Sequence, residues 1–106
     1  MQTIQSTLSK QGVLTVRMNR PQVHNAFDAV MIGELTETLR AADGDSEISL
    51  LVITGAGSSF SAGADVHWMR SLVDASEKDN ERDALQLAGL MRALNYFTKP
   101  TIARIN

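Results

Sequence analysis

A short run of small and polar residues at positions 59–65, SFSAGAD, carries the strongest chemical signal in this sequence. The side chains at 61–64 are small enough for another molecule to approach the main chain closely. Asp65 has the character of a helix N-cap, and residues 66–70 after it are expected to be helical. Backbone N–H groups beside the positive end of a helix dipole can bind an anion. The run therefore predicts an oxyanion or anion site, although a tight turn capped by Asp65 would use the same residues and stays open as the alternative.

Other kinds of site find less support. The two glycines that precede the run lack the third glycine of a dinucleotide-binding fingerprint, and no Gly-Lys-Ser/Thr triplet of a P-loop occurs. Ser61 has Gly63 two residues after it but Ser59 two residues before it, so it does not form a nucleophile elbow. There is no cysteine and no cluster of metal ligands, so we expect no metal site.

The elements around the run predict how it is positioned. Residues 49–54 contain four consecutive apolar residues, two of them β-branched, and are followed by Gly55. They predict a buried strand that leads into the run. Residues 29–42 have apolar side chains at helical spacing, with Asp28 as the expected N-cap. A strand over 13–18 precedes this helix. Together they predict a right-handed strand–helix–strand unit with parallel strands.

The remaining segments complete a partial α/β domain. Residues 3–9 are expected to form a half-exposed strand in an antiparallel hairpin with 13–18. The charged run 74–83 predicts a solvated connector, and a helix follows over roughly 82–97. Its buried face is expected to carry Leu87, Ala88, Met91 and Leu94. A strand over 101–105 is expected to leave the sheet with an exposed edge and an uncovered face.

Composition excludes several classes of protein. Hydrophobic residues make up 43% and charged residues 21%, which is typical of a globular domain. The formal net charge of −2 provides no basic stripe to neutralise nucleic-acid phosphates. No apolar run approaches the ~18 residues of a membrane span, and the first residues lack the layout of a signal peptide. We expect a cytoplasmic protein with no nucleic-acid and no membrane partner.

Three motifs in order resemble the crotonase (enoyl-CoA hydratase/isomerase) superfamily. They are MNRPQVHNAF at 18–27, LVITG at 51–55 and FSAGAD at 60–65, and KPTIA at 99–103 resembles the next strand of that family. The resemblance covers essentially the whole chain. It implies an α/β fold of the ClpP/crotonase type, a spiral of ββα units. Residues 1–106 would be its N-terminal part, with the remaining core and the C-terminal helices absent.

The resemblance implies an enzyme that adds water to a 2-enoyl-CoA thioester through an enolate held in an oxyanion hole. By position, the N–H of Ala64 would be one of two oxyanion donors. Contacts to the coenzyme A part of the substrate would come from Gln22, Val23, Ala26, Ala62, Asp65 and Val66. Many relatives carry a lysine that can reach phosphate at the position of Gln22, which is neutral. Coenzyme A belongs to the substrate, so no separate cofactor is implied.

The resemblance leaves the reaction open. An enoyl-CoA isomerase or another acyl-CoA enzyme could use the same hole, because the acid/base carboxylates and the second donor would follow Asn106. The 106 residues alone would then be inactive, as a non-catalytic CoA-thioester-binding or assembly segment. Trp68 and Met69 resemble members that act on branched or glutaconyl-type acyl groups. The family also implies a homo-oligomer, a trimer or a hexamer.

Overall fold

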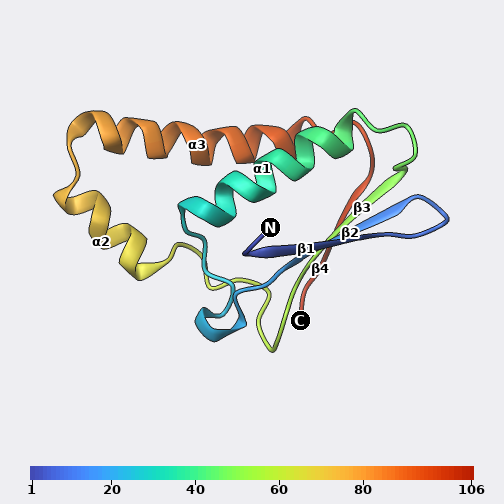
Figure 1. Cartoon of the computed structure of the whole chain (residues 1–106), viewed down its shortest axis with the longest axis horizontal. Helices are drawn as coiled ribbons and strands as arrows, with labels where there is room; N and C mark the ends of the chain where they lie inside the picture. The colour runs from blue at the N-terminus through green and yellow to red at the C-terminus, as the bar shows by residue number, and fades with distance from the viewer.

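The protein, described over residues 1–106 by a computed structural model, has a four-stranded sheet with helices on one side (Figure 1). The strands are β1 (Ile4–Leu8), β2 (Val13–Met18), β3 (Leu50–Gly55) and β4 (Thr101–Arg104). The helices are the 3₁₀ turn η1 (Pro21–Val23), α1 (Ala29–Asp43), α2 (Val66–Asp74) and α3 (Glu77–Asn95). The strand order is β1-β2-β3-β4, with β1 antiparallel to β2 and the other neighbours parallel. The predicted hairpin and parallel crossover are confirmed.

Helix α1 supplies more residues to the hydrophobic core than any other element. The carboxylate of Asp28 accepts a hydrogen bond from the N–H of Met31 at 2.9 Å, so the predicted N-cap is confirmed. One face of the helix is buried against the sheet and carries Met31, Ile32, Leu35, Leu39 and Ala42. The inward side chains of β2 and β3, such as Val16 and Leu51, complete this core. Helical spacing of apolar residues therefore predicted the packing of α1 correctly.

The charged run 74–83 is solvated as predicted, with no buried residue, but the predicted connector is wrong because α3 already begins at Glu77. The hydroxyl of Ser76 caps the helix by accepting from the N–H of Asp79 at 3.1 Å. Acidic side chains in the first turn are favourable beside the positive end of the helix dipole. The first turns of α3 project beyond the sheet, so they need no apolar face (Figure 1). No helix of the structure is apolar over a length sufficient to cross a membrane.

The predicted buried face of α3 is also wrong in part. Leu87 and Met91 are exposed, whereas Leu90 is the buried residue of this helix. Ala93 and Leu94 pack partly buried beside it. The helix crosses α1 along one narrow stripe, so only residues near Leu90 reach the core. An apolar spacing alone does not say which of two adjacent stripes faces the neighbouring helix.

Strand β4 is positioned by the end of α1. The carboxylate of Asp43 accepts from the N–H and the hydroxyl of Thr98, at 2.9 and 2.6 Å. These hydrogen bonds lower the pKa of Asp43 below its ordinary value. The ammonium of Lys99 donates to the carbonyl of Ala42 at 2.6 Å and so caps the last turn. β4 pairs only with β3 and its side chains are exposed, as expected of an uncovered edge.

Replacing Leu39 by alanine tests the core. Leu39 is 2% exposed, so Leu39→Ala should lower the free energy of unfolding of the intact protein by about 2–5 kcal/mol. Leu85→Ala is the matched control, because Leu85 is 65% exposed and the change should stay within about 0.5 kcal/mol. Urea unfolding followed by circular dichroism measures both, and equal effects would contradict the assigned core.

Candidate functional site

Two loops that lie far apart in the sequence meet at one end of the sheet. The first loop (residues 19–28) follows β2 and the second loop (residues 56–65) follows β3. The two strands are parallel and end in register, so both loops leave the sheet at the same edge (Figure 1). They are joined there by a parallel β-bridge between Phe27 and Ala64. The carboxyl ends of parallel strands are where α/β proteins commonly bind ligands.

The bridge leaves the amide of Ala64 free. The N–H of Phe27 donates to the carbonyl of Gly63 at 2.7 Å, and the carbonyl of Phe27 accepts from the N–H of Asp65 at 2.7 Å. In a parallel pair this pattern turns the N–H of the intervening residue to the opposite side. The N–H of Ala64 makes no hydrogen bond, and Ala64 is exposed. Since α2 begins two residues later, this unpaired donor lies beside a helix N-terminus and suits an oxyanion.

Gly63 keeps the approach to this donor open. Its φ of +91° lies in the left-handed region, where a side chain is strained. A Cβ built on Gly63 would meet no atom within 4 Å, so the space in front of it is empty. The hydroxyl of Ser61 accepts from the N–H of Gly63 at 3.1 Å and donates to the carbonyl of Asn25 at 2.9 Å. Ser61 is therefore a connector between the loops and not a nucleophile.

One guanidinium connects the two loops. Arg20 Nη2 lies 3.1 Å from Asp65 Oδ2 and 3.4 Å from Asp28 Oδ2, while Nη1 donates to the carbonyl of Ala26. Each carboxylate uses its other oxygen to cap a helix, α1 for Asp28 and α2 for Asp65. The Arg20–Asp28–Asp65 cluster therefore couples the first turns of both helices to the pairing of the loops.

The buried side chain of Asn25 holds the second loop in place. Asn25 was not predicted as a site residue. It is fully buried, and its amide donates to the carbonyls of Ala56 and Ser59 at 2.9 and 2.8 Å. Its Oδ1 accepts from the N–H of Arg20 at 2.8 Å. Its φ of +56° is a conformation that asparagine tolerates better than most residues. No local pattern marks Asn25 as this clamp, because the carbonyls that its amide binds are more than thirty positions away in the sequence.

Gly55 permits this packing by lacking a side chain. A Cβ there would lie 2.6 Å from the carbonyl oxygens of Ser59 and Phe60, and 2.8 Å from the amide of Asn25. These neighbours are backbone atoms and a buried side chain, so they cannot move aside cheaply. The glycine that ends β3 is thus required for the second loop to fold back over the strand.

The structure brings all seven predicted site residues into these loops and the start of α2. Gln22 is exposed and Val23 half-buried in η1, and Val66 is exposed as the first residue of α2. Ala62 is exposed, but its N–H is committed to the carbonyl of His24 at 2.9 Å. Of the alanines predicted in the second loop, only Ala64 therefore offers a free donor.

Two of the predicted residues face inward. Ala26 is buried, and its carbonyl accepts a hydrogen bond from Arg20. The carboxylate of Asp65 accepts hydrogen bonds from Arg20 and from the N–H of Trp68, where it caps α2. The hydrogen bond from the N–H of Trp68 lowers the pKa of Asp65 below its ordinary value, and Arg20 adds to this effect against the opposing effect of burial. Asp65 is therefore an ionised structural carboxylate.

The two histidines do not form an acid–base pair with these carboxylates. His24 Nδ1 lies 3.0 Å from the hydroxyl of Ser59, which links the loops at the surface. His67 is exposed and lines an open cavity of about 350 Å³ between the starts of α1 and α2. Trp68 lines the same cavity, with its Nε1 buried and without a partner. No group of three or more His, Asp or Glu side chains could hold a metal ion.

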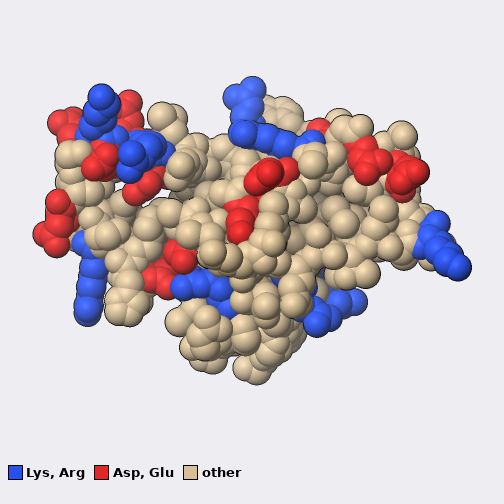
Figure 2. Space-filling view, in the orientation of Figure 1, with Lys and Arg blue, Asp and Glu red and all other residues tan.

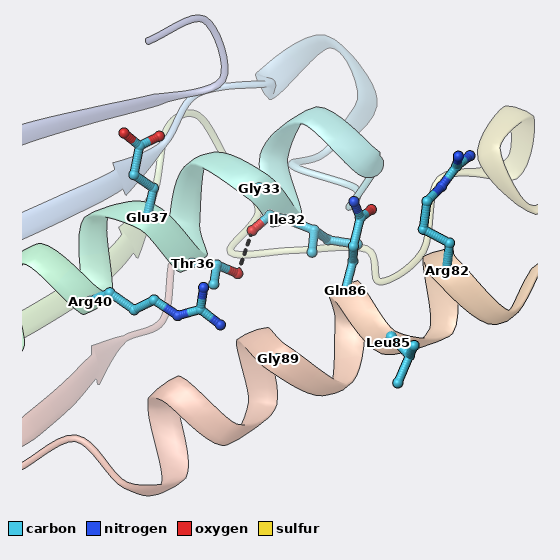
Figure 3. A pocket seen from close by; sticks show the side chains of 9 residues that line it. All are labelled: Ile32, Gly33, Thr36, Glu37, Arg40, Arg82, Leu85, Gln86 and Gly89. Carbon is cyan, nitrogen blue, oxygen red and sulfur yellow. Dashed lines mark hydrogen bonds between the residues drawn. The ribbon is translucent and has the colours of Figure 1, made fainter. Parts of the chain in front are cut away.

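A larger hollow, of about 520 Å³, lies elsewhere, in a groove between α1 and α3 (Figure 3). Arg40 reaches across this groove over Gly89, where a Cβ would lie 3.6 Å from Arg40 Nη2. The groove is lined by helix flanks, whose backbone N–H groups are already paired. On the face shown in Figure 2, basic and acidic side chains are interspersed, and no basic stripe is present. The loops therefore remain the better candidate.

Sequence comparisons give a consistent result. A family model described as Enoyl-CoA hydratase/isomerase matches residues 9–106. The 2,3-dehydroadipyl-CoA hydratase of Escherichia coli is 36% identical over 97 residues, which cover 92% of this chain and 36% of the relative. The 4-chlorobenzoyl coenzyme A dehalogenase-2 of an Arthrobacter species is also 36% identical over 97 residues, covering 90% of this chain and 35% of the relative.

A solved structure agrees in fold. The crystal structure of an enoyl-CoA hydratase from Shewanella pealeana superposes with a TM-score of 0.93 at 38% identity, and the match covers 98% of this chain and 39% of that one. The present chain therefore spans well under half the length of the proteins it matches.

Changing Asn25 to aspartate tests the buried clamp. The replacement keeps the shape and the acceptor but points a carboxylate oxygen at two carbonyls. Asn25→Asp should lower the free energy of unfolding at pH 7 by about 3–5 kcal/mol, as expected for an uncompensated buried charge. Asn80→Asp, at an exposed position, is the control and should change it by no more than about 0.5 kcal/mol. Equal small effects in urea unfolding would refute the clamp.

Asp65→Asn tests the ionised cap. Because the pKa of Asp65 is lower in the folded chain, the ionised carboxylate stabilises the fold above its ordinary pKa of 3.8. That contribution to stability is lost as the pH falls through the lower pKa that Asp65 has in the folded chain. Asparagine can still cap α2 but cannot pair with Arg20. The variant should be less stable than the parent at pH 7, and the difference should shrink below pH 3.8. A difference that does not depend on pH would contradict this role.

Proposed function

The chain belongs to the enoyl-CoA hydratase/isomerase family, and we propose that the intact protein adds water to the double bond of a 2-enoyl-CoA thioester. The observation that carries the proposal is the unpaired N–H of Ala64 beside the N-terminus of α2. Addition of water next to a thioester carbonyl passes through an enolate. A fixed N–H donor stabilises the negative charge where it develops on the carbonyl oxygen.

The coenzyme A part of the substrate is proposed to lie across the outer edges of both loops. Gln22 of the first loop, Ala62 of the second loop and Val66 at the start of α2 provide exposed surface there, and Val23 is half-buried beside Gln22. Since Gln22 is neutral, it would offer a hydrogen bond to the coenzyme and no charge to its phosphates. Binding energy from this remote part of the substrate would hold the thioester carbonyl against Ala64.

An apolar cavity supports a place for the acyl chain. A partly open cavity of about 110 Å³ is lined by apolar side chains alone, among them Phe27, Phe60, Ile53 and Met91. Phe27 is the residue whose backbone pairs with Ala64, so one wall of the cavity adjoins the proposed donor. An apolar cavity stays dry and accepts an apolar group. We assign it to the apolar end of the acyl chain.

Hydration also needs groups that move protons to and from water and the α-carbon. The carboxylates of the two loops belong to Asp28 and Asp65, and both are held by Arg20 and by helix N-termini. We therefore assign them no acid–base role. The 106 residues by themselves are proposed to bind a thioester and to supply one oxyanion donor without turnover.

Another reaction at the same thioester is the second candidate. The dehalogenase relative is as similar to this chain as the hydratase relative, at 36% identity each. A backbone donor polarises a thioester carbonyl in an isomerase or dehalogenase as well as in a hydratase. Incubation of the intact protein with crotonyl-CoA, a 3-enoyl-CoA and 4-chlorobenzoyl-CoA in parallel distinguishes the three reactions by their products.

Three finer features remain proposals. A branched or glutaconyl-type acyl group is proposed from Trp68 and Met69 at the start of α2. A trimer or hexamer is proposed from the free edge of β4 and from the exposed side chains of Val66, Met69 and Val73 along α2. A cytoplasmic location is proposed as the default compartment for a chain of ordinary globular composition.

Ala64→Pro tests the proposed donor. Proline has no N–H, so the intact variant should lose at least ~10²-fold in kcat for crotonyl-CoA hydration. Ala64→Gly is the control, because it keeps the N–H and should retain most of the turnover. The loss of enoyl absorbance measures the rate, and circular dichroism checks that both variants fold. Unchanged turnover in a folded Ala64→Pro protein would refute the assignment.

A further inference from the structure

We propose that Arg20 is the positioning residue for the Ala64 donor. Its guanidinium holds the two loops together and so sets the direction in which this N–H points. The inference rests on the proposed function. Arg20 touches none of the reacting atoms and would act only through the backbone of the loops.

The first argument is where the contacts of Arg20 fall. On the first loop it holds the carbonyl of Ala26 and the carboxylate of Asp28, which flank Phe27 on both sides. On the second loop it holds the carboxylate of Asp65, the neighbour of Ala64. The guanidinium thus grips residues on either side of the single bridge between the loops. The other hydrogen bonds between the loops join residues 24–25 to residues 56–62, so at the bridge itself the guanidinium adds a third attachment to the two backbone hydrogen bonds.

The second argument is charge. The side chain of Arg20 is 16% exposed, and those of Asp65 and Asp28 are 7% and 27% exposed. Two carboxylates therefore face one cation in a partly buried place. Without the guanidinium they would repel each other across the junction of the loops, and Asp65 would keep a nearly buried charge with no cation. Removing Arg20 should therefore push the two loops apart as well as weaken their attachment to each other.

The third argument is the shape of the group. Nη1 and Nη2 point to different acceptors, the carbonyl of Ala26 and the two carboxylates. A planar guanidinium holds such acceptors at fixed directions, whereas the ammonium of lysine is a single point charge on a flexible stem. Arg20→Lys should relieve the repulsion but lose the fixed geometry. Arg20→Lys therefore distinguishes the effect of the positive charge from the effect of the fixed geometry on the direction of the Ala64 N–H.

A spectroscopic test reports directly whether the N–H of Ala64 points at the thioester carbonyl of a bound ligand. The intact protein is saturated with butyryl-CoA, which has no double bond to hydrate, carrying ¹³C in the thioester carbonyl. Hydrogen bonding by Ala64 lowers the carbonyl stretching frequency relative to free ligand. Arg20→Met should lose most of this shift while still binding, and Arg20→Lys should show an intermediate shift. Arg40→Met is the matched control, since Arg40 lies in the distant α1–α3 groove, and should keep the full shift.

Kinetics give an independent readout. A misplacement of a catalytic group by about 1 Å can lower the rate by roughly 10²-fold. Arg20→Met should therefore lower kcat for crotonyl-CoA hydration by up to ~10²-fold. KM should change less than kcat, because the surfaces proposed for coenzyme A do not involve Arg20. A purely stabilising role would lower the amount of folded protein but leave both kcat per folded molecule and the carbonyl shift unchanged.

The outcomes separate this inference from the proposed function. If Ala64→Pro retains the shift and the turnover, the proposed donor is wrong. If Ala64→Pro loses both while Arg20→Lys and Arg20→Met keep them, the donor stands and the positioning role is overturned. If Arg20→Met does not fold, Arg20→Lys decides alone: an intermediate shift supports the positioning role, and a wild-type shift overturns it.

Discussion

The ion pairs between Arg20 and two N-cap carboxylates are the interaction on which the geometry of the site depends. Asp28 and Asp65 each divide their oxygens between a helix N-terminus and the same guanidinium. The start of α1, the start of α2 and the junction of the two loops are therefore held by one set of contacts. In the positioning role proposed for Arg20, a shift of any of the three would turn the Ala64 amide, which has no hydrogen bond of its own to hold it.

A site built from main-chain N–H groups places unusual demands on the sequence. Side chains around the donor must be small, and the supporting polar groups must lie on the far side, away from the ligand. Gly63 and Ala64 satisfy the first demand, and the buried clamp of Asn25 satisfies the second. The same arrangement explains why the nearby carboxylates are poor candidates for proton transfer. Both are occupied in holding the loops, and the pKa of Asp65 is lowered below its ordinary value by the hydrogen bond from the N–H of Trp68 and by Arg20. The proposed donor would therefore be fixed in place before any ligand binds.

The fold was largely predictable from local patterns, whereas the site was predictable only in part. The spacing of apolar residues in α1 and the caps at Asp28 and Asp65 are local, and the structure confirms them. The start of α3 was missed, because a helix that projects from the domain needs no apolar stripe. The run at 59–65 was identified from small residues, but the free state of the Ala64 N–H follows from its register with Phe27, 37 positions earlier. Pairing across such a distance leaves no mark in either segment alone.

Exchange of the Ala64 amide for an ester in the intact protein tests the central claim most directly. Semisynthesis with lactic acid at this position removes only the N–H and keeps the methyl side chain and the chain path. If this N–H stabilises the enolate, kcat for crotonyl-CoA hydration should fall by ~10²–10³-fold while the protein stays folded. A folded ester variant with the kcat of the parent would contradict the account, whatever the other residues of the loops do.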